Sequence, residues 1–270
     1  MTLDDTELKQ RLDFAVDAAC QAGELILDYY QTDDLHVELK SDASPVTVAD
    51  RGAEQLIRRL IDEVFPRDGV LGEEFDDKRS FSGFRWILDP IDGTKSFVSG
   101  VPLFGTLVGL EYKNRIVAGV CRLPALDEVV YAAVGQGTWW QQGDRQPQRT
   151  TVSSVAHLSD ALLCYTSVQG FVTIDRMDVF ETLGRSARLT RGWGDCYGHL
   201  LVATGRADVM VDPLLSPWDA AALIPLLQEA GGHFVAWNGE VTIHAGNGIS
   251  VNSALRNDVL NMLNPGDANR

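Results

Sequence analysis

Residues 86–94 read Trp-Ile-Leu-Asp-Pro-Ile-Asp-Gly-Thr, and no other stretch restricts the possible folds of this chain as strongly. The apolar residues predict a strand that delivers two carboxylates, Asp89 and Asp92, before a Gly-Thr pair opens the next element. Pro90 fixes its own φ angle and removes a backbone donor, so the Ile91 carbonyl can point inward with the two acids. The fold must therefore provide a partner for two negative charges at this strand end.

Two carboxylates this close cannot both ionise cheaply in isolation, because one of the two pKa values is pushed up. A hard cation removes that cost, and ligands that are all oxygen favour Mg²⁺ or Ca²⁺ over zinc. A surface turn is the alternative interpretation, since Asp-Pro and Asp-Gly are both common turn dipeptides. The other acids of the chain help to decide between the two.

Three further acids stand where a strand ends or a helix begins. Glu73 follows a short apolar run in Gly-Glu-Glu, Asp219 lies in Pro-Trp-Asp-Ala-Ala, and Asp50 ends Val-Thr-Val-Ala-Asp. Each has an ordinary explanation: Glu73 as a solvated loop residue, Asp50 and Asp219 as acids that offset a helix dipole, which is worth up to ~1 kcal/mol. Together with Asp89 and Asp92, however, they indicate one acidic site.

The periodicity predicts an α/β chain with two unlike halves. Helices are expected over 8–29 and 53–65, and strands at 70–71, 85–88, 104–112, 116–122 and 128–134. After the polar stretch 141–154, strands are expected near 161–165 and 207–211, and helices near 174–183, 196–204 and 218–230. We also expect Asp4 to cap the first helix, Lys113-Asn114 to form a hairpin turn, His199 to face helix packing, and Gly231-Gly232 to end the helix before it. We therefore expect an α+β half over residues 1–145 with most of the metal ligands, and an α/β half over 146–270, joined in one catalytic unit.

Composition excludes several classes of protein. The chain has 270 residues, and its 23 Lys+Arg against 38 Asp+Glu give a net charge of -15, which repels nucleic acid and anionic lipid. No apolar run approaches the roughly 20 residues that span a bilayer. The four cysteines lie far apart, without disulfide or zinc spacing, and the N-terminus is polar. We expect a cytoplasmic protein that binds neither nucleic acid nor membrane.

In the segments around these acids, the chain resembles the Mg²⁺-dependent inositol monophosphatase-like phosphatases. That family carries Gly-Glu-Glu, Asp-Pro-Ile-Asp-Gly-Thr and a distal Trp-Asp in the order found here, and the resemblance runs from about Leu12 to Leu263. It implies an α/β fold of the layered αβαβα sandwich type, a phosphoric monoester hydrolase that takes a small phosphate ester, and a homodimer.

The resemblance also implies which residues hold the ions. One Mg²⁺ is expected on Glu73, Asp89 and the Ile91 carbonyl. A second is expected on Asp89, Asp92 and Asp219, with Asp89 bridging the two, and a third, looser ion would use Glu73 and water. Two ions about 3.5–4 Å apart can hold the attacking water and the leaving oxygen on opposite sides of phosphorus. An acidic protein would thus recruit its anionic substrate through cations.

The catalytic residues implied by the resemblance are Asp50, Thr94 and Glu73. Thr94 would contact the nucleophilic water, with Asp50 behind it, and the amides of Gly93 and Thr94 would meet the phosphate as substrate-binding groups. A non-catalytic scaffold that only binds metal is the alternative from another class of protein. It has no need of Thr94 and Asp50 together, so an enzyme is expected.

The leaving group is expected to be histidinol. Residues 192–198, Gly-Trp-Gly-Asp-Cys-Tyr-Gly, resemble the histidinol-phosphate phosphatase branch of the family, and the alignment implies that Asp195 and Asp212 touch the substrate. Two carboxylates suit the ammonium and imidazole of histidinol better than the neutral hydroxyls of inositol. As alternatives, Asp195 could cap a helix and Asp212 could end a strand. Trp218 resembles the inositol-type enzymes, so inositol-1-monophosphatase is the second prediction.

Overall fold

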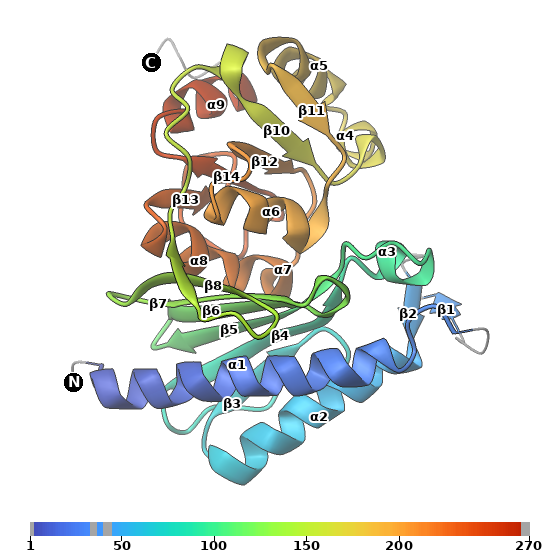
Figure 1. Cartoon of the computed structure of the whole chain (residues 1–270), viewed down its shortest axis with the longest axis vertical. Coiled ribbons are helices and arrows are strands. Elements are labelled where there is room, and N and C mark those ends of the chain that lie inside the picture. Colours follow the sequence, from blue (N-terminus) through green and yellow to red (C-terminus); the bar gives the residue numbers. More distant parts are fainter. Residues whose placement is uncertain (1–2, 33–36, 40–44, 266–270) are drawn as a thin grey trace.

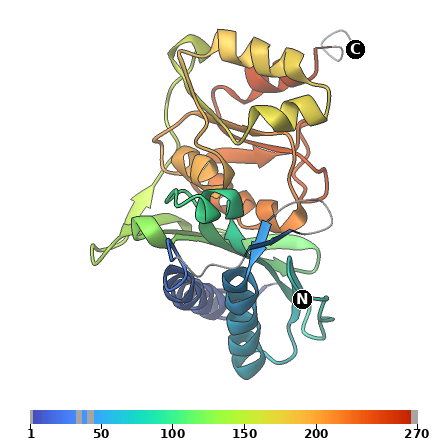
Figure 2. The same cartoon turned by 90° about the vertical axis from the view of Figure 1, so that its right-hand side faces the viewer.

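The computed structural model describes residues 3–32, 37–39 and 45–265 and arranges them in alternating layers (Figure 1). In this part of the chain the layers are a helix pair, a seven-stranded sheet, a central group of helices, a five-stranded sheet and an outer group of helices. Figure 2, turned by 90°, shows the same order. This is the αβαβα sandwich that the resemblance implies, so the predicted fold class is confirmed.

The larger sheet follows the order of the chain from β3 to β9. Its neighbouring strands are antiparallel, apart from β3 and β4, which run parallel. Lys113 and Asn114 form the predicted turn, because both have the positive φ angles of a two-residue hairpin, 50° and 62°. The strands are β3 (Gly69–Gly72), β4 (Phe84–Asp92), β5 (Gly105–Tyr112), β6 (Arg115–Leu123), β7 (Glu128–Ala133), β8 (Gly137–Gln142) and β9 (Gln148–Thr150).

Two long helices, α1 (Asp5–Leu27) and α2 (Val48–Val64), cover the outer face of this sheet (Figure 1). Asp4 caps α1 by accepting hydrogen bonds from the amides two and three residues further on, as its spacing predicts. The short strands β1 (Val37–Leu39) and β2 (Pro45–Thr47) pair with each other, and β2 leads directly into α2. This brings Asp50, on the first turn of α2, to the same end of the molecule as α3 (Thr94–Val98).

The smaller sheet has the strand order β11-β10-β12-β14-β13 within the described residues. β11 and β12 both run parallel to β10, whereas β14 is antiparallel to its two neighbours. Its strands are β10 (Leu162–Tyr165), β11 (Leu189–Arg191), β12 (Val209–Asp212), β13 (Gly232–Val235) and β14 (Gly248–Asn252). The remaining helices are α4 (Val168–Thr173), α5 (Met177–Ser186), α6 (Asp195–Ala203), α7 (Pro217–Ala221), α8 (Leu223–Glu229) and α9 (Arg256–Leu263), with the 3₁₀ turns η1 (Pro124–Leu126) and η2 (Leu158–Asp160).

The apolar core follows the layers. α6, α7 and α8 lie between the two sheets, and α4, α5 and α9 cover the far side of the smaller one (Figure 1). Along β4, Trp86 and Leu88 pack into the cluster under α1 and α2, whereas Ile87 packs into the cluster between the sheets. A strand that is apolar on both faces lies in the middle of such a stack, which explains the continuous apolar run before Asp89.

Two predicted helices are wrong in their extent. The helix expected over 174–183 begins later, at Met177, as α5, because Asp175 adopts a left-handed conformation (φ 56°) before it; the separate helix α4 precedes Asp175. The helix expected over 218–230 divides at Ala222 into α7 and α8. Pro225 explains the division, since it has no N–H to donate to the carbonyl four residues earlier. Gly231, at φ 83°, ends α8 as predicted.

The expected boundary between residues 145 and 146 falls in the turn between β8 and β9, and the larger sheet continues to Thr150. Side chains also connect the two halves: Glu229 accepts hydrogen bonds from the amides of Gly135 and Gly137, and Arg206 pairs with Glu128 at 2.8 Å. In the part of the chain that the structure describes, no helix is both long and apolar enough to cross a membrane.

Candidate active site

A bulge in β4 turns Asp89 and Asp92 toward one cavity. In a regular strand, residues three apart point to opposite faces of the sheet. Here Asp89 is paired with Leu107 of β5 and Asp92 with Gly105, so β4 has one residue more than β5 between the two pairs. Pro90 lies in the bulge, where its lack of a backbone N–H costs the sheet no hydrogen bond. The sequence of the strand end is thus the reason that both carboxylates face the same way.

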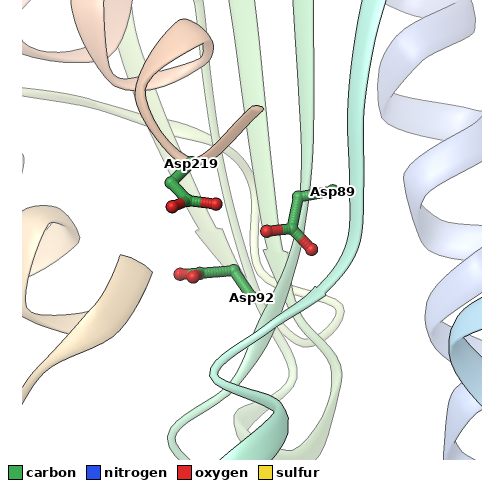
Figure 3. Close-up of side chains that lie close together, drawn as sticks. All are labelled: Asp89, Asp92 and Asp219. Atoms are coloured by element: carbon green, nitrogen blue, oxygen red, sulfur yellow. The ribbon is translucent and has the colours of Figure 1, made fainter. Parts of the chain in front are cut away.

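Asp219 reaches this pair from the other half of the chain. It lies in the first turn of α7, where its Oδ2 accepts a hydrogen bond from the Ser216 amide at 2.7 Å in a capping box. Carboxylate oxygens of Asp89, Asp92 and Asp219 lie within 4.8 Å of one another (Figure 3). Asp92 is also held by the Cys196 amide at the start of α6. Both halves of the molecule therefore build one acidic cluster.

Burial and mutual repulsion make this cluster costly without a cation. Burial raises the pKa of Asp89 well above its usual range, and the charges of Glu73, Asp92 and Asp219 raise it further. Burial also raises the pKa of Asp92 strongly, and it raises that of Asp219 to about 6. Among the described residues, the buried Oδ1 of Asp89 has no hydrogen-bond partner. A buried, unpartnered acceptor within an all-oxygen donor set fits a hard divalent cation.

The cluster lies on the wall of a cavity of about 260 Å³. Glu73 lies on the same wall, and its amide donates to the Leu88 carbonyl at 3.2 Å, which fixes the residue after β3 beside β4. Lys95 is the one basic side chain that lines this cavity within the described residues. The structure thus brings together eight of the predicted site residues on the cavity wall, namely Glu73, Asp89, Ile91, Asp92, Gly93, Thr94, Asp195 and Asp219.

Asp50 lies behind Thr94 and not on the cavity wall. The Thr94 hydroxyl is 3.5 Å from Asp50 Oδ1 and 2.9 Å from the Ile91 carbonyl oxygen, so its single proton has two possible acceptors. Asp50 is itself held by Thr47, whose amide and hydroxyl both donate to Oδ2, at 2.7 and 2.6 Å. Burial raises the pKa of Asp50, and the bonds from Thr47 oppose that rise.

Asp195 reaches the cavity, whereas Asp212 lies behind it. Burial raises the pKa of Asp195 to about 7. A Cβ on Gly93 would lie 3.2 Å from Asp195 Oδ2, so the backbone at Gly93 and this carboxylate are close neighbours. Gly194 is the N-cap of α6, so the alternative of Asp195 as the cap is wrong. Asp212 is 4% exposed at the end of β12, and its Oδ2 accepts a hydrogen bond from the Thr166 hydroxyl at 2.6 Å.

Sequence reasoning missed three residues of this region. Lys95 follows Thr94 at the start of a helix, and that position alone could have indicated it. Leu214 also lines the cavity, and Thr166 bonds to both Asp195 and Asp212, but no local pattern marks either of them. His199 faces the interior as expected, with its Nδ1 2.7 Å from the Ser250 hydroxyl.

The layered fold and this acidic cavity are those of a phosphatase family that acts through bound cations. The chain belongs to the inositol monophosphatase family, whose model matches residues 7–263. It is 43% identical to a histidinol-phosphatase of Chlorobaculum parvum, covering 96% of this chain and 98% of the relative. It is 38% identical to a histidinol-phosphatase of Mycobacterium tuberculosis, with 93% and 97% covered. The crystal structure of the extragenic suppressor protein suhB from Bartonella henselae matches with a TM-score of 0.85 and 31% identity, covering 95% of this chain and 99% of that one.

Proposed function

We propose that this protein is a Mg²⁺-dependent histidinol-phosphatase that hydrolyses L-histidinol phosphate to L-histidinol and phosphate. One observation carries the proposal: a single cavity is lined by a carboxylate cluster that needs cations and by a further carboxylate, Asp195. The similarity to two histidinol-phosphatases over nearly the whole chain supports the same substrate.

The acidic cluster would hold two ions, and Glu73 with water a third. Asp89, Asp92 and Asp219 would bind one, and Glu73, Asp89 and the Ile91 carbonyl another, so that Asp89 is shared. The Ile91 carbonyl accepts from Thr94 but has a second lone pair free for such a role. When bound, Mg²⁺ supplies a water of lowered pKa and neutralises charge on the phosphoryl oxygens.

The residues beside the cluster would position the nucleophile and the phosphate. Thr94 can donate its proton to Asp50 or to Ile91, which leaves its oxygen free to accept a hydrogen bond from the attacking water. Asp50, held by its partners, would orient this hydroxyl. The amides of Gly93 and Thr94 and the ammonium of Lys95 would receive the phosphate oxygens. Hydrolysis then needs positioning and charge neutralisation rather than a covalent intermediate.

Asp195 would select the leaving group. As a carboxylate, it can accept a charge-assisted hydrogen bond from the ammonium of histidinol, whereas the hydroxyls of inositol offer neutral donors only. A cation beside Asp195 would also lower its pKa from the raised value of about 7, so binding would favour the charged form. We also propose a homodimer, which sedimentation equilibrium can test.

The test is a phosphate-release assay with Mg²⁺ on L-histidinol phosphate, inositol 1-phosphate and glycerol phosphate. We expect the highest kcat/KM for histidinol phosphate. Asp195→Asn keeps the shape and removes the charge, so it should cost histidinol phosphate roughly 10- to 150-fold, because a hydrogen bond to a charged group is worth about 1.5–3 kcal/mol. The neutral esters serve as internal controls. Two results would contradict this proposal: a wild-type preference for inositol 1-phosphate, or an equal loss of kcat/KM on all esters in Asp195→Asn. The function would then be that of an inositol-1-monophosphatase, which Trp218 favours.

A further inference from the structure

Thr166, directly after β10, connects Asp195 and Asp212 through its hydroxyl group. Its Oγ1 accepts a hydrogen bond from the Asp195 amide at 3.0 Å and donates to Asp212 Oδ2 at 2.6 Å. The directions are determined, because an amide N–H can only donate and an ionised carboxylate can only accept. The bond from Asp195 therefore uses a lone pair of the hydroxyl, and the bond to Asp212 uses its proton.

The backbone of Asp195 needs such support. Its φ angle is 52°, in the left-handed region, where the Cβ of a residue with a side chain lies close to the following carbonyl oxygen. Conformations of this kind persist where the surrounding structure determines them. Gly194 contributes through close packing, since a Cβ there would lie 2.3 Å from the Thr166 Cα. The start of α6 thus packs closely against the end of β10, and the Thr166 hydroxyl forms a hydrogen bond between the two.

His199 is a second neighbour of Asp212. Its Oδ2 is 3.9 Å from Nε2 of His199, which is 1% exposed and is itself held by the Ser250 hydroxyl. Asp212 does not line the cavity. Asp212 therefore reaches the cavity side through the Thr166 hydroxyl that it holds, and through its charge, which raises the pKa of Asp195.

We propose that Thr166 is a positioning residue for leaving-group selection. It holds the Asp195 backbone in its left-handed conformation, and Asp212 orients the Thr166 hydroxyl for this task. Asp212 then acts through Thr166, in place of the direct substrate contact that the family resemblance implies for it. The inference rests on the proposed function, since it needs a leaving group that Asp195 recognises.

The test compares Thr166→Val, which keeps the shape and removes both hydrogen bonds, with Thr166→Ser, which keeps the hydroxyl. For Thr166→Val we expect kcat/KM for L-histidinol phosphate to fall about 2- to 12-fold through a higher KM, since a hydrogen bond contributes about 0.5–1.5 kcal/mol. The loss for glycerol phosphate should be smaller, and Thr166→Ser should restore the ratio between the two esters. Thr138→Val is the matched control, because Thr138 is a buried threonine whose hydroxyl donates to the Leu226 carbonyl at 2.9 Å, away from the cavity. It should leave the ratio unchanged.

A double-mutant cycle separates positioning from general loss of structure. On the Asp195→Asn background, Thr166→Val should change the ester ratio no further, because the group that it positions has already lost its charge. Equal slowing of both esters, failure of Thr166→Ser to restore the ratio, or effects of Thr166 and Asp195 that multiply would each overturn the inference.

Failure of the proposed function has a different signature. A wild-type enzyme that does not prefer histidinol phosphate over glycerol phosphate contradicts the proposed substrate. The cycle is then measured with the ester that the wild-type enzyme does prefer. Coupling between Thr166 and Asp195 on that ester supports positioning, and its absence, or an inert Asp195→Asn, overturns it.

Discussion

Buried carboxylates lie at both ends of β4, and the two ends differ in what neutralises them. Near the start of the strand, Asp68 is 1% exposed and accepts hydrogen bonds from Arg11, at 2.9 and 3.2 Å, from Ser82 at 2.6 Å and from the Trp86 indole at 3.1 Å. At the other end, Asp89 is 2% exposed and keeps an unpartnered oxygen among the described residues.

Residue type does not explain this difference, because the buried acid is an aspartate beside the same apolar strand at both ends. The first acid carries its counter-charge within the fold, and the Arg11 guanidinium is further held over the Phe84 ring, 3.7 Å from its centroid. The second group gathers acids around Asp89, and none of the ion pairs between described residues involves Asp89. A buried acid with its own cation stabilises the structure, whereas buried acids that repel one another mark a place for an external ion.

The largest effect is expected from a change at the cavity end of β4, where Asp89 lies. Asp89→Asn should lower phosphatase activity roughly a thousandfold or more, because the shared ligand of the bound ions is lost and metal ions supply several kcal/mol of transition-state stabilisation. In EDTA at neutral pH, the same variant should unfold at a higher temperature than the wild type, because one buried, repelling charge is gone. A phosphate-release assay and thermal unfolding measure the two effects. Wild-type activity that persists in EDTA, or a near-normal rate for Asp89→Asn, contradicts the metal assignment.

The next prediction tests whether Thr94 positions the nucleophilic water without holding the metal ions. Thr94→Ala should lower kcat by about 10²- to 10⁴-fold, the range of a positioned proton-transfer group, while calorimetric Mg²⁺ binding is largely retained. Thr94→Ser keeps the hydroxyl and should retain most of the rate. Loss of Mg²⁺ binding in step with activity would make Thr94 a structural residue and the Thr94–Asp50 relay wrong.

The first end of β4 should respond in the opposite way. Arg11→Met leaves Asp68 as an uncompensated buried charge, so the free energy of unfolding should fall by about 3 kcal/mol. Urea unfolding measures this loss. At a temperature where the variant is still folded, kcat should stay near the wild-type value, because Arg11 is at the far end of the strand from the cavity. A fall in kcat of the folded variant would show that the two ends are coupled and would contradict the separation.

The last prediction is a dependence of stability on pH without metal. Burial raises the pKa of Asp219 to about 6 and of Asp195 to about 7, above the roughly 3.9 of an unfolded chain. Folding therefore favours the protonated forms: their stabilising contribution is complete below about pH 4 and is lost as the pH rises through 6 to 7. In EDTA, Tm should fall over this range, by about 2–4 °C for each kcal/mol lost. Asp195→Asn should show a smaller fall, and Mg²⁺ at pH 7 should restore the wild-type Tm. If Mg²⁺ does not reverse the fall in Tm, the carboxylates of the cavity are not its cause.

Much of the fold could be predicted from local sequence. The Asp4 cap, the Lys113-Asn114 turn and the Gly231 helix stop each depend on a few neighbouring residues, so periodicity and turn chemistry identify them. The predictions that failed are those in which a neighbouring residue interrupts an apolar pattern. Asp175 delays the start of α5, and Pro225 divides into α7 and α8 the helix that the apolar spacing would continue.

The candidate site divides in the same way. By itself, the sequence determined that Asp89 and Asp92 would stand together, because the bulge that aims them is encoded within four residues of one strand. Only the tertiary structure decided that Asp219 would complete their cluster and that Asp212 would lie behind Thr166. It also distinguished the neutralised Asp68 from the acids of the cavity. The physical reason is that the state of a buried charge depends on its partners in space. Arg11, the counter-charge of Asp68, and Asp219, the neighbour of Asp89, each lie more than 50 residues away in the chain.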